Sequence, residues 1–488
     1  MLRYLELVFD MPLKQSFTYR ADEKTITASA VGKRAAAPFG RRDLTGCIVA
    51  ERDAPPPGLA EAQIKTVRRI VDKEALFGQN EIDLSAWLAS YYLCSQGEAL
   101  AAMLPSGRRA GASPSLGADE LEGAASGEGR LSLSAEQEAA LQALSGGAGA
   151  GGVSYLFGVT GSGKTEVFLR AAESFLHQGT SVVYLVPEIS LTLQTSLVIT
   201  KRFGPLAATF HSGLSGSARL REWMRIKRGE ARIVVGPRSA VFAPVQNLGL
   251  IIIDEEHDGS FKSGSTPRYH ARQVALRRAA RSGAALVMGS ATPSAEAWKL
   301  MAEGRIRRLD LTQRLSGGTV PSVRIVSLER TDGCLTAELK DEIRQTALAG
   351  RQTILFLNRR GFAYFYHCRE CGYILECKHC SVSLTWHKGR GKAVCHYCGY
   401  QTAPPDACPT CGSLEAGFTG FGTEMIEEEI RRTFPELRVR RVDADTMQKK
   451  GSLEEALNAF RAGAFDILLG TQMVAKGLNF PGVRLVGV

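Results

Sequence analysis

The stretch LFGVTGSGKT, from Leu156 to Thr165, decides how the rest of the sequence is interpreted. A short apolar run breaks into the spacing G-x-x-x-x-G-K-T, and the helical pattern EVFLRAAESFLHQG follows. Glycines let successive backbone N–H groups point at one anion, and a helix N-terminus adds positive charge. The stretch therefore predicts a P-loop that binds ATP. Its expected nucleotide-binding residues are Gly158, Thr160, Gly161, Ser162, Gly163, Lys164 and Thr165.

A second apolar run, Leu248–Ile253, leads into the acidic sequence DEEH at 254–257. Such a run is typical of a strand buried on both faces of a parallel sheet, and ligands bind at the carboxyl ends of such strands. We expect Asp254 and Thr165 to hold Mg²⁺, and Glu255 to orient or deprotonate the attacking water. The predicted catalytic residues are Lys164, Asp254 and Glu255.

Apolar runs that end in polar motifs recur along the chain, in SVVYLVPEIS, TFHSGLS, RIVVGPRSAVF and ALVMGSATPS. The repeat predicts an α/β fold with a doubly wound nucleotide-binding sheet. Residues 335–488 repeat the pattern without a second P-loop. Two such lobes would form a cleft in which ATP hydrolysis is coupled to lobe closure.

The composition fits a multidomain protein with a polyanionic partner. Sixty basic and fifty acidic residues leave a net charge of +10, and 44% of the 488 residues are hydrophobic. This balance favours nucleic acid as the partner. We expect a cytoplasmic location and no contact with a membrane, because no apolar run approaches eighteen residues and the N-terminal stretch contains charges.

The N-terminal segment, residues 1–105, combines strand-like runs with a predicted hairpin whose basic tip contains Gly40 and Arg41. Phe17 and Tyr19 suit stacking on DNA bases, although core packing explains both aromatics equally well. A tract rich in glycine, alanine and serine at 106–130 predicts a flexible linker.

Gln137 has two possible roles in the sequence. Ser134 and Gln137 have the spacing of a helix-capping box, which by itself accounts for the pair. Gln137 also precedes Lys164 by 27 positions, where helicases often place a glutamine that reads adenine. We favour the adenine role.

Eight of the eleven cysteines lie between Cys368 and Cys411, all in C-x-x-C pairs. In a cytosolic protein this pattern predicts two Zn²⁺ ions, each held by four thiolates. A zinc ribbon needs a long hairpin between its knuckles, which favours two nested sets, with interleaved pairing as the alternative. The favoured sets are Cys377, Cys380, Cys395 and Cys398, and Cys368, Cys371, Cys408 and Cys411.

Taken in order, the motifs GVTGSGKTEV, LVPEISLT, HSGLS, DEEHD with PRYHAR, GSATPS, LFLNRRG, the cysteine block, GTE and LLGTQMVAKG resemble the PriA family of bacterial primosomal helicases. The resemblance implies a superfamily 2 helicase that moves 3′ to 5′ on DNA and restarts stalled replication forks. It also implies two RecA-like lobes, a β-rich domain that binds DNA 3′ ends, and nested zinc sites. Expected partners are single-stranded and forked DNA, primosome proteins and single-stranded-DNA-binding protein.

The resemblance also assigns DNA contacts to the second lobe and divides the chain into parts. Arg359, Arg360 and Thr423 are the expected DNA-binding residues of that lobe. The expected parts are the DNA-binding domain 1–105, the linker 106–130, lobe 1 at 131–334, lobe 2 at 335–366 and 414–488, and the zinc insertion 367–413.

The sequence departs from the family pattern in three places. We expect only the linker 106–130 where the family has a winged-helix domain, Thr18 stands where the family has an acid between the aromatics of its 3′-end pocket, and the sequence given stops at Val488, before the family's next motif with the arginine that completes the ATP site. We therefore expect slow hydrolysis and weak preference for a free 3′ end. The alternative function is a DNA-binding adaptor with little ATPase activity, and a nuclease-type translocase ranks far behind.

Overall fold

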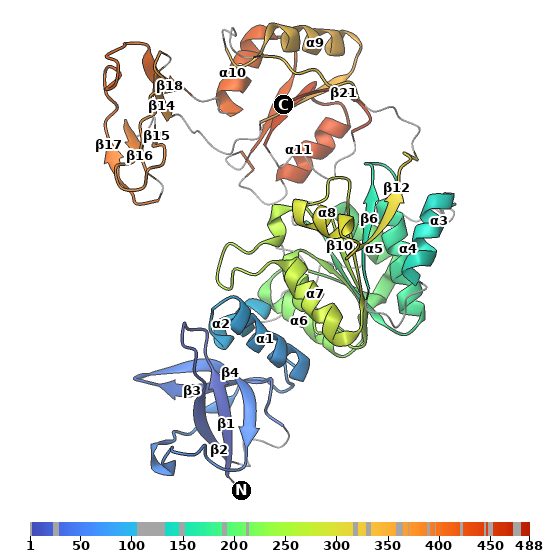
Figure 1. The fold of residues 1–488 in the computed structure, drawn as a ribbon, viewed down its shortest axis with the longest axis vertical. Coiled ribbons are helices and arrows are strands. Elements are labelled where there is room, and N and C mark those ends of the chain that lie inside the picture. The colour runs from blue at the N-terminus through green and yellow to red at the C-terminus, as the bar shows by residue number, and fades with distance from the viewer. Residues whose placement is uncertain are drawn as a thin grey trace. The chain divides into compact units, whose positions relative to one another are not determined.

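The computed structural model describes residues 2–22, 29–104, 132–145, 152–187, 193–210, 214–315, 321–327, 333–357, 365–368, 370–387, 391–395, 397–419, 423–443, 446–447, 452–471 and 480–488. The chain forms two compact units, Met1–Thr319 and Val320–Val488 (Figure 1). No helix within the described ranges is both long and apolar enough to cross a bilayer. The linker at 106–130 falls outside them, and the five-part division of the chain remains a prediction.

The N-terminal domain is an antiparallel sheet with the strand order β2-β1-β4-β3-β5. Edge strand β2 also bonds to the segment just before β5, because the Arg20 N–H donates to the Lys65 carbonyl at 2.8 Å and the Val67 N–H donates to the Arg20 carbonyl at 2.9 Å. The predicted hairpin is present, with Gly40 at φ 59° and Arg41 exposed at its tip. The strands are β1 (Leu2–Val8), β2 (Phe17–Asp22), β3 (Arg34–Phe39), β4 (Arg42–Arg52) and β5 (Arg69–Ile70).

Two helices, α1 (Gln79–Tyr91) and α2 (Gln96–Met103), follow this sheet and share a hydrophobic core with lobe 1. The Trp223 indole N–H donates to the Leu76 carbonyl at 2.8 Å, and its ring meets Phe77 edge-on. The N-terminal domain and lobe 1 therefore belong to one compact unit.

Lobe 1 contains a seven-stranded sheet, β12-β6-β11-β10-β7-β9-β8, in which every pairing is parallel. This confirms the predicted doubly wound sheet. The strands are β6 (Val153–Gly158), β7 (Ser181–Leu185), β8 (Ala207–Thr209), β9 (Ile233–Gly236), β10 (Leu248–Asp254), β11 (Ala285–Ser290) and β12 (Arg307–Leu311). The helices are α3 (Ala135–Ser145), α4 (Lys164–His177), α5 (Leu193–Phe203), α6 (Gly216–Lys227), α7 (Ala271–Ser282) and α8 (Ala295–Ala302).

Side chains on the lobe 1 strands alternate between two apolar cores. Leu250 and Ile252 of β10 pack in the core that includes residues of α3, α4 and α5, whereas Ile251 and Ile253 pack in the core that includes residues of α6, α7 and α8. A period of two places neighbouring side chains on opposite faces, so a strand covered on both faces must be apolar throughout. This explains the unbroken apolar run before the acidic motif.

Lobe 2 is a smaller parallel sheet with the order β19-β20-β13-β21, and α9 and α10 pack on one core while α11 packs on another. The elements are α9 (Ala337–Leu348), β13 (Gln352–Phe356), α10 (Thr423–Thr433), β19 (Val439–Val442), α11 (Ser452–Arg461), β20 (Ile467–Gly470) and β21 (Val483–Gly487).

The cysteine-rich insertion leaves and rejoins the chain through one antiparallel ribbon, β14 (Phe365–Cys368) with β18 (Ala416–Thr419). Beyond it lies a small sheet of β15 (Thr385–His387), β16 (Lys392–Val394) and β17 (Gln401–Thr402). Its apolar cluster is small, with Leu384 and Ala393 buried beside two cysteines.

Candidate nucleotide, zinc and DNA sites

The P-loop connects β6 to α4, as predicted. Gly161 and Gly163 have φ values of 82° and 77°, and a Cβ on Gly163 would lie 2.3 Å from Gln137 Nε2, so a larger residue does not fit. The Ser162 hydroxyl is buried and has no hydrogen-bond partner within the described chain, while Thr165 is exposed at the start of α4. A curled backbone at a helix N-terminus, with an unsatisfied buried hydroxyl, fits a phosphate group.

Lys164 lies over this loop and is itself buried. Its Nζ donates to the Gly158 carbonyl at 2.9 Å and to the Val159 carbonyl at 3.3 Å. Burial lowers the pKa of Lys164, and the carboxylates of Glu255 and Asp254 oppose that shift. The P-loop and the acidic motif end two parallel strands that are separated only by β11, so both can act on one nucleotide.

Gln137 forms the predicted capping box, because the Ser134 N–H donates to Gln137 Oε1 at 2.9 Å and the Gln137 N–H donates to Ser134 Oγ at 3.3 Å. Its Nε2 also donates to the Ser162 carbonyl at 3.1 Å. Gln137 thus supports the P-loop through a bond that its spacing in the sequence did not reveal. Its adenine role remains a prediction.

Asp254 ends β10 and is held by two donors. The Tyr184 hydroxyl on the neighbouring strand β7 donates to Oδ2 at 3.0 Å, and the Glu255 N–H donates to Oδ1 at 2.9 Å. Burial and the nearby charge of Glu255 raise the pKa of Asp254 to about 6. A divalent cation at this carboxyl group would favour its ionised form. Both oxygens keep lone pairs for metal-bound water.

Glu255 follows in a strained backbone conformation, with a φ of 49°. Non-glycine residues in this region cost about 1–3 kcal/mol and often occur at functional sites. The Ser290 hydroxyl at the end of β11 donates to Glu255 Oε2 at 3.1 Å, and His257 Nδ1 lies 2.7 Å from Ser290 Oγ. Glu255 is therefore aimed along the carboxyl edge of the sheet beside Asp254.

Unlike Glu255, Glu256 belongs to a buried network of hydrogen bonds and an ion pair that the sequence did not predict. Its carboxylate pairs with Arg272 and accepts hydrogen bonds from the hydroxyls of Ser294 at 2.8 Å and Tyr155 at 3.2 Å. Arg272 belongs to the PRYHAR motif and Ser294 to GSATPS, so the network joins three motifs. Only the fold brings these distant positions together.

The eight cysteines form two groups of four, and within each group all sulfur atoms lie within 4.8 Å of one another. The Cys368–Cys411, Cys371–Cys408 and Cys377–Cys398 sulfurs are 3.6, 3.5 and 3.6 Å apart. Four thiolates around Zn²⁺ at about 2.3 Å would place their sulfurs about 3.8 Å apart, so both groups fit the metal. The groups are Cys368, Cys371, Cys408 and Cys411, and Cys377, Cys380, Cys395 and Cys398, the nested sets favoured by the sequence.

The four C-x-x-C pairs, each called a knuckle, have the same turn. The residue after each second cysteine donates its N–H to the carbonyl of the first at 2.9 to 3.0 Å and adopts a positive φ. Backbone N–H groups also lower the pKa of Cys395 to about 7. The positive-φ residues are Gly372, Gly399, Gly412 and, at 50°, Ser381.

The candidate base-stacking aromatics of the N-terminal domain lie in its core. Tyr19 is 5% exposed and donates its hydroxyl to the Pro38 carbonyl at 3.1 Å. Phe17 is half-buried and packs edge-on against Phe39. Core packing accounts for Tyr19, whereas part of Phe17 remains accessible. A stacking role for either residue stays a prediction.

Thr18 lies on the opposite face of β2, where the structure supplies a nearby carboxylate. Glu6 on β1 pairs in register with Thr18 and accepts hydrogen bonds from Thr18 Oγ1 at 3.1 Å and Ser16 Oγ at 2.6 Å. Arg52 Nε lies 3.4 Å from Glu6 Oε1. A carboxylate on the adjacent strand therefore lies beside Thr18, a neighbour that only strand pairing reveals.

Among the lobe 2 candidates, Thr423 begins α10 and donates its hydroxyl to Asp443 Oδ2 at 2.7 Å. Bonds from Thr423 and Thr446 help to hold the pKa of Asp443 below its usual value, although burial opposes the shift. Arg359 and Arg360 lie outside the described residues. The predicted DNA contacts of all three candidates stay predictions.

Family models match most of the chain. Residues 134–300 match the DEAD/DEAH box helicase model and residues 418–488 match the helicase conserved C-terminal domain. Residues 6–105 match the 3′ DNA-binding domain of PriA, and residues 377–402 match the Cys-rich region of the PriA DNA helicase. With two RecA-like lobes and a P-loop, these matches define an ATP-dependent DNA helicase.

Comparison with two relatives identifies the family. The chain is 50% identical over 493 residues to replication restart protein PriA of Treponema pallidum, covering 100% of this chain and 74% of that protein. It belongs to the replication restart protein PriA family. The Bacillus subtilis member is 46% identical over 338 residues, which span 68% of this chain and 42% of that protein. A RecG structure bound to a three-way DNA junction is similar at a TM-score of 0.42, with 16% identity, over 73% of this chain and 38% of that one.

Proposed function

We propose that this chain binds Mg²⁺–ATP at the carboxyl edge of β6 and β10 and uses its hydrolysis to move 3′ to 5′ along DNA at stalled forks. The observation that carries the proposal is that the P-loop after β6 and the acidic residues that end β10 lie at the same carboxyl edge of one parallel sheet, with only β11 between the two strands. An adaptor without ATPase activity would not need this arrangement, so the motor is favoured.

Each residue of the site has a separate task in this proposal. P-loop N–H groups and Lys164 bind the phosphates, while Thr165 and Asp254 hold Mg²⁺, which neutralises phosphate charge when bound. Glu255, oriented by Ser290, positions the attacking water and accepts its proton. The Ser290 contact links the water-positioning residue to the GSATPS motif.

The zinc insertion is proposed to be a structural platform that contacts DNA or a primosome protein. Four-thiolate sites leave no open coordination position for chemistry. Lys378 lies over the Tyr400 ring at 4.8 Å, so a cation and an aromatic ring are already paired on this module. Primosome proteins and single-stranded-DNA-binding protein are the protein partners we propose.

The decisive experiment for the motor is ATPase activity of the purified chain with and without single-stranded DNA. We expect DNA-stimulated turnover that Glu255→Gln removes while nucleotide and DNA binding persist. Ser260→Ala, on the loop that follows the acidic motif, serves as a control that keeps the site. DNA binding without any stimulated turnover would favour the adaptor.

The N-terminal domain is proposed to hold a DNA 3′ end, with Glu6 in place of the acid that the family has at the position of Thr18. Its carboxylate is buried and accepts hydroxyl hydrogen bonds from Ser16 and Thr18, so a terminal 3′-OH would take the place of one of these hydroxyl donors. The test compares oligonucleotides with a 3′-OH and a 3′-phosphate. Glu6→Gln should reduce the preference for the 3′-OH, whereas equal binding of both ends by the parent chain would contradict the proposal.

A further inference from the structure

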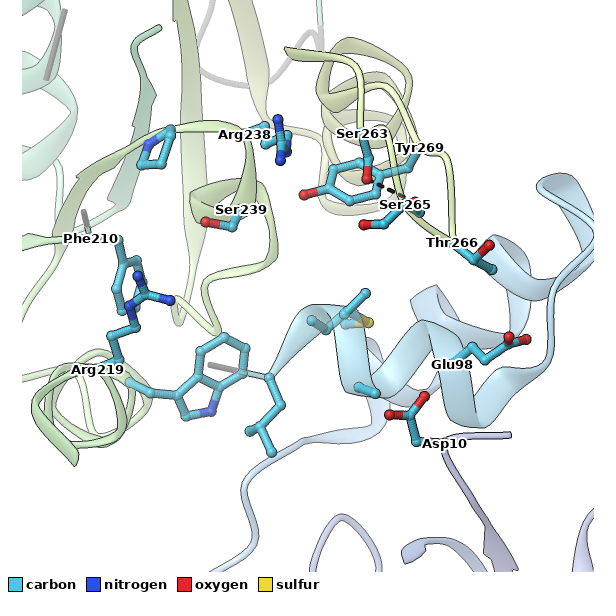
Figure 2. A pocket seen from close by; sticks show the side chains of 16 residues that line it. Asp10, Glu98, Phe210, Arg219, Arg238, Ser239, Ser263, Ser265, Thr266 and Tyr269 are labelled. Atoms are coloured by element: carbon cyan, nitrogen blue, oxygen red, sulfur yellow. Dashed lines mark hydrogen bonds between the residues drawn. The ribbon is translucent and has the colours of Figure 1, made fainter. Parts of the chain in front are cut away.

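The residues assigned to the ATP site serve the phosphates, the metal ion and the attacking water, and they leave the base of the nucleotide without an apolar contact. Ligand pockets are lined mainly by apolar side chains, with a few polar groups that fix the orientation. The cavity of about 530 Å³ between α2 and lobe 1 does not supply such a wall, because no P-loop residue lines it (Figure 2). A contact for the base must therefore lie beside the P-loop itself.

Residues 312–315, which follow β12, lie against the P-loop. The Leu315 N–H donates to the Gly161 carbonyl at 3.0 Å. A Cβ on Gly163 would lie 2.7 Å from Leu315 Cδ1, so the leucine side chain lies directly beside the loop at the start of α4. The backbone hydrogen bond and the side-chain contact together fix Leu315 at the edge of the phosphate site.

Leu315 is apolar and yet 56% exposed. Leu311, four residues earlier on β12, is buried in the core beneath the P-loop helix. Exposure of a large apolar side chain beside a phosphate site leaves one face open to a planar ring. Covering that face would remove apolar surface from water and would therefore add affinity for the nucleotide.

Glu136 holds the segment in this position. The Thr312 N–H donates to Glu136 Oε2 at 2.8 Å, and the Thr312 hydroxyl donates to Oε1 at 2.6 Å. Gln137, the next residue of α3, donates to the Ser162 carbonyl of the P-loop. The first turn of α3 therefore bonds to the P-loop through one side chain and to the segment after β12 through the other.

We propose that Leu315 packs against the base of ATP bound at the P-loop, and that Glu136 is a positioning residue that holds 312–315 in place for this contact. The inference rests on the proposed ATP site and names a residue that covers the base there. Five positions after Leu315 comes Val320, where the second compact unit begins. ATP would therefore contact the segment of chain that continues into lobe 2, whereas tripolyphosphate, which has no base, would not.

The test of the base contact compares the binding of ATP and of tripolyphosphate, both with Mg²⁺, by calorimetry. Leu315→Ala should weaken ATP binding about 5- to 10-fold, because it removes apolar surface that the base would cover, and should leave tripolyphosphate binding unchanged. Leu348→Ala, which truncates an exposed leucine at the end of α9, is the control and should change neither affinity. Unchanged ATP affinity in Leu315→Ala, or equal weakening of both ligands, would overturn the proposal.

The test of the positioning residue uses two carboxylates in the first turn of α3, so that their effect on the helix dipole is matched. Glu136→Ala should weaken ATP binding about two- to fivefold and spare tripolyphosphate, whereas Glu138→Ala, an exposed neighbour, should spare both. Amide hydrogen exchange gives a second measurement. In the parent chain, ATP should slow exchange at 312–315 and tripolyphosphate should not.

The outcomes separate this inference from the proposed function. Equal protection of 312–315 by the two ligands, or equal effects of Glu136→Ala and Glu138→Ala on ATP binding, would overturn the inference and leave the phosphate site intact. A parent chain that binds neither ATP nor tripolyphosphate would instead refute the proposed ATP site.

Discussion

Lobe 1 and the zinc insertion are stabilised by different interactions. Lobe 1 buries two extensive apolar cores on the faces of a seven-stranded sheet, and its functional residues stand at the edge of that rigid support. The insertion has only a small apolar cluster beside two groups of four cysteines. Burial of apolar surface stabilises the first region, whereas metal binding must stabilise the second.

The contrast predicts that losing one zinc ligand unfolds the insertion and spares lobe 1. Structural Zn²⁺ contributes about 10–16 kcal/mol of apparent binding free energy in small zinc peptides, so this is the largest expected effect. Cys377→Ser should reduce the zinc content from two ions to one and expose the insertion to protease, while nucleotide binding stays normal. Elemental analysis and nucleotide titration measure both.

Cys94→Ser is the matched control, because Cys94 is buried between α1 and α2 and belongs to neither group. It should keep two zinc ions. Fewer than two ions in the metal-replete parent would contradict the two-site structure, and loss of nucleotide binding in Cys377→Ser would show that the two regions do not fold independently.

Within lobe 1, substituting the phosphate-binding residue and substituting the water-positioning residue should have different effects. Lys164→Ala should lose nucleotide binding, because it removes the cation beside Gly158 and leaves the loop with backbone donors alone. Glu255→Gln should still bind ATP but hydrolyse it about 10²- to 10⁴-fold more slowly. Fluorescent-nucleotide titration and single-turnover hydrolysis distinguish the two. Normal ATP binding by Lys164→Ala would refute the P-loop assignment.

A smaller effect is expected from removing the Tyr184 hydroxyl group that donates a hydrogen bond to Asp254. Tyr184→Phe keeps the buried ring and removes the hydroxyl that donates to Asp254 Oδ2. Partners of metal-binding groups typically change metal affinity 10- to 100-fold, so we expect about a tenfold increase in the Mg²⁺ concentration needed for half-maximal nucleotide binding. Tyr155→Phe, whose hydroxyl binds Glu256 instead, is the control and should leave this concentration unchanged.

The smallest predicted effect concerns the one knuckle that lacks glycine. Ser381 has a φ of 50° where the other three turns have glycine. Ser381→Gly should stabilise the insertion by about 1 kcal/mol because it relieves this strain. The chelator concentration that releases half the zinc should rise accordingly, and Gly372→Ala should lower it. A fall for Ser381→Gly would mean that the serine side chain stabilises its turn.

The sequence by itself determined the parts whose chemistry is local. The P-loop, the apolar run before Asp254 and the C-x-x-C pairs each combine a spacing with a residue type, so ligand chemistry and the doubly wound fold could be read without coordinates. The Ser134–Gln137 capping box was equally local. Hairpin length even favoured the two cysteine sets that the fold brings together, because C-x-x-C pairs on one ribbon must face each other.

The tertiary structure alone decided contacts between positions far apart in the chain. Strand pairing placed Glu6 beside Thr18 and Tyr184 beside Asp254, and the sheet's parallel order gathered Glu256, Arg272 and Ser294. The cavity between α2 and lobe 1 likewise exists only after both domains pack together. A one-dimensional pattern shows which face or turn a residue occupies, but its neighbour across a sheet depends on strand order and register, which are set by the packing of the whole unit.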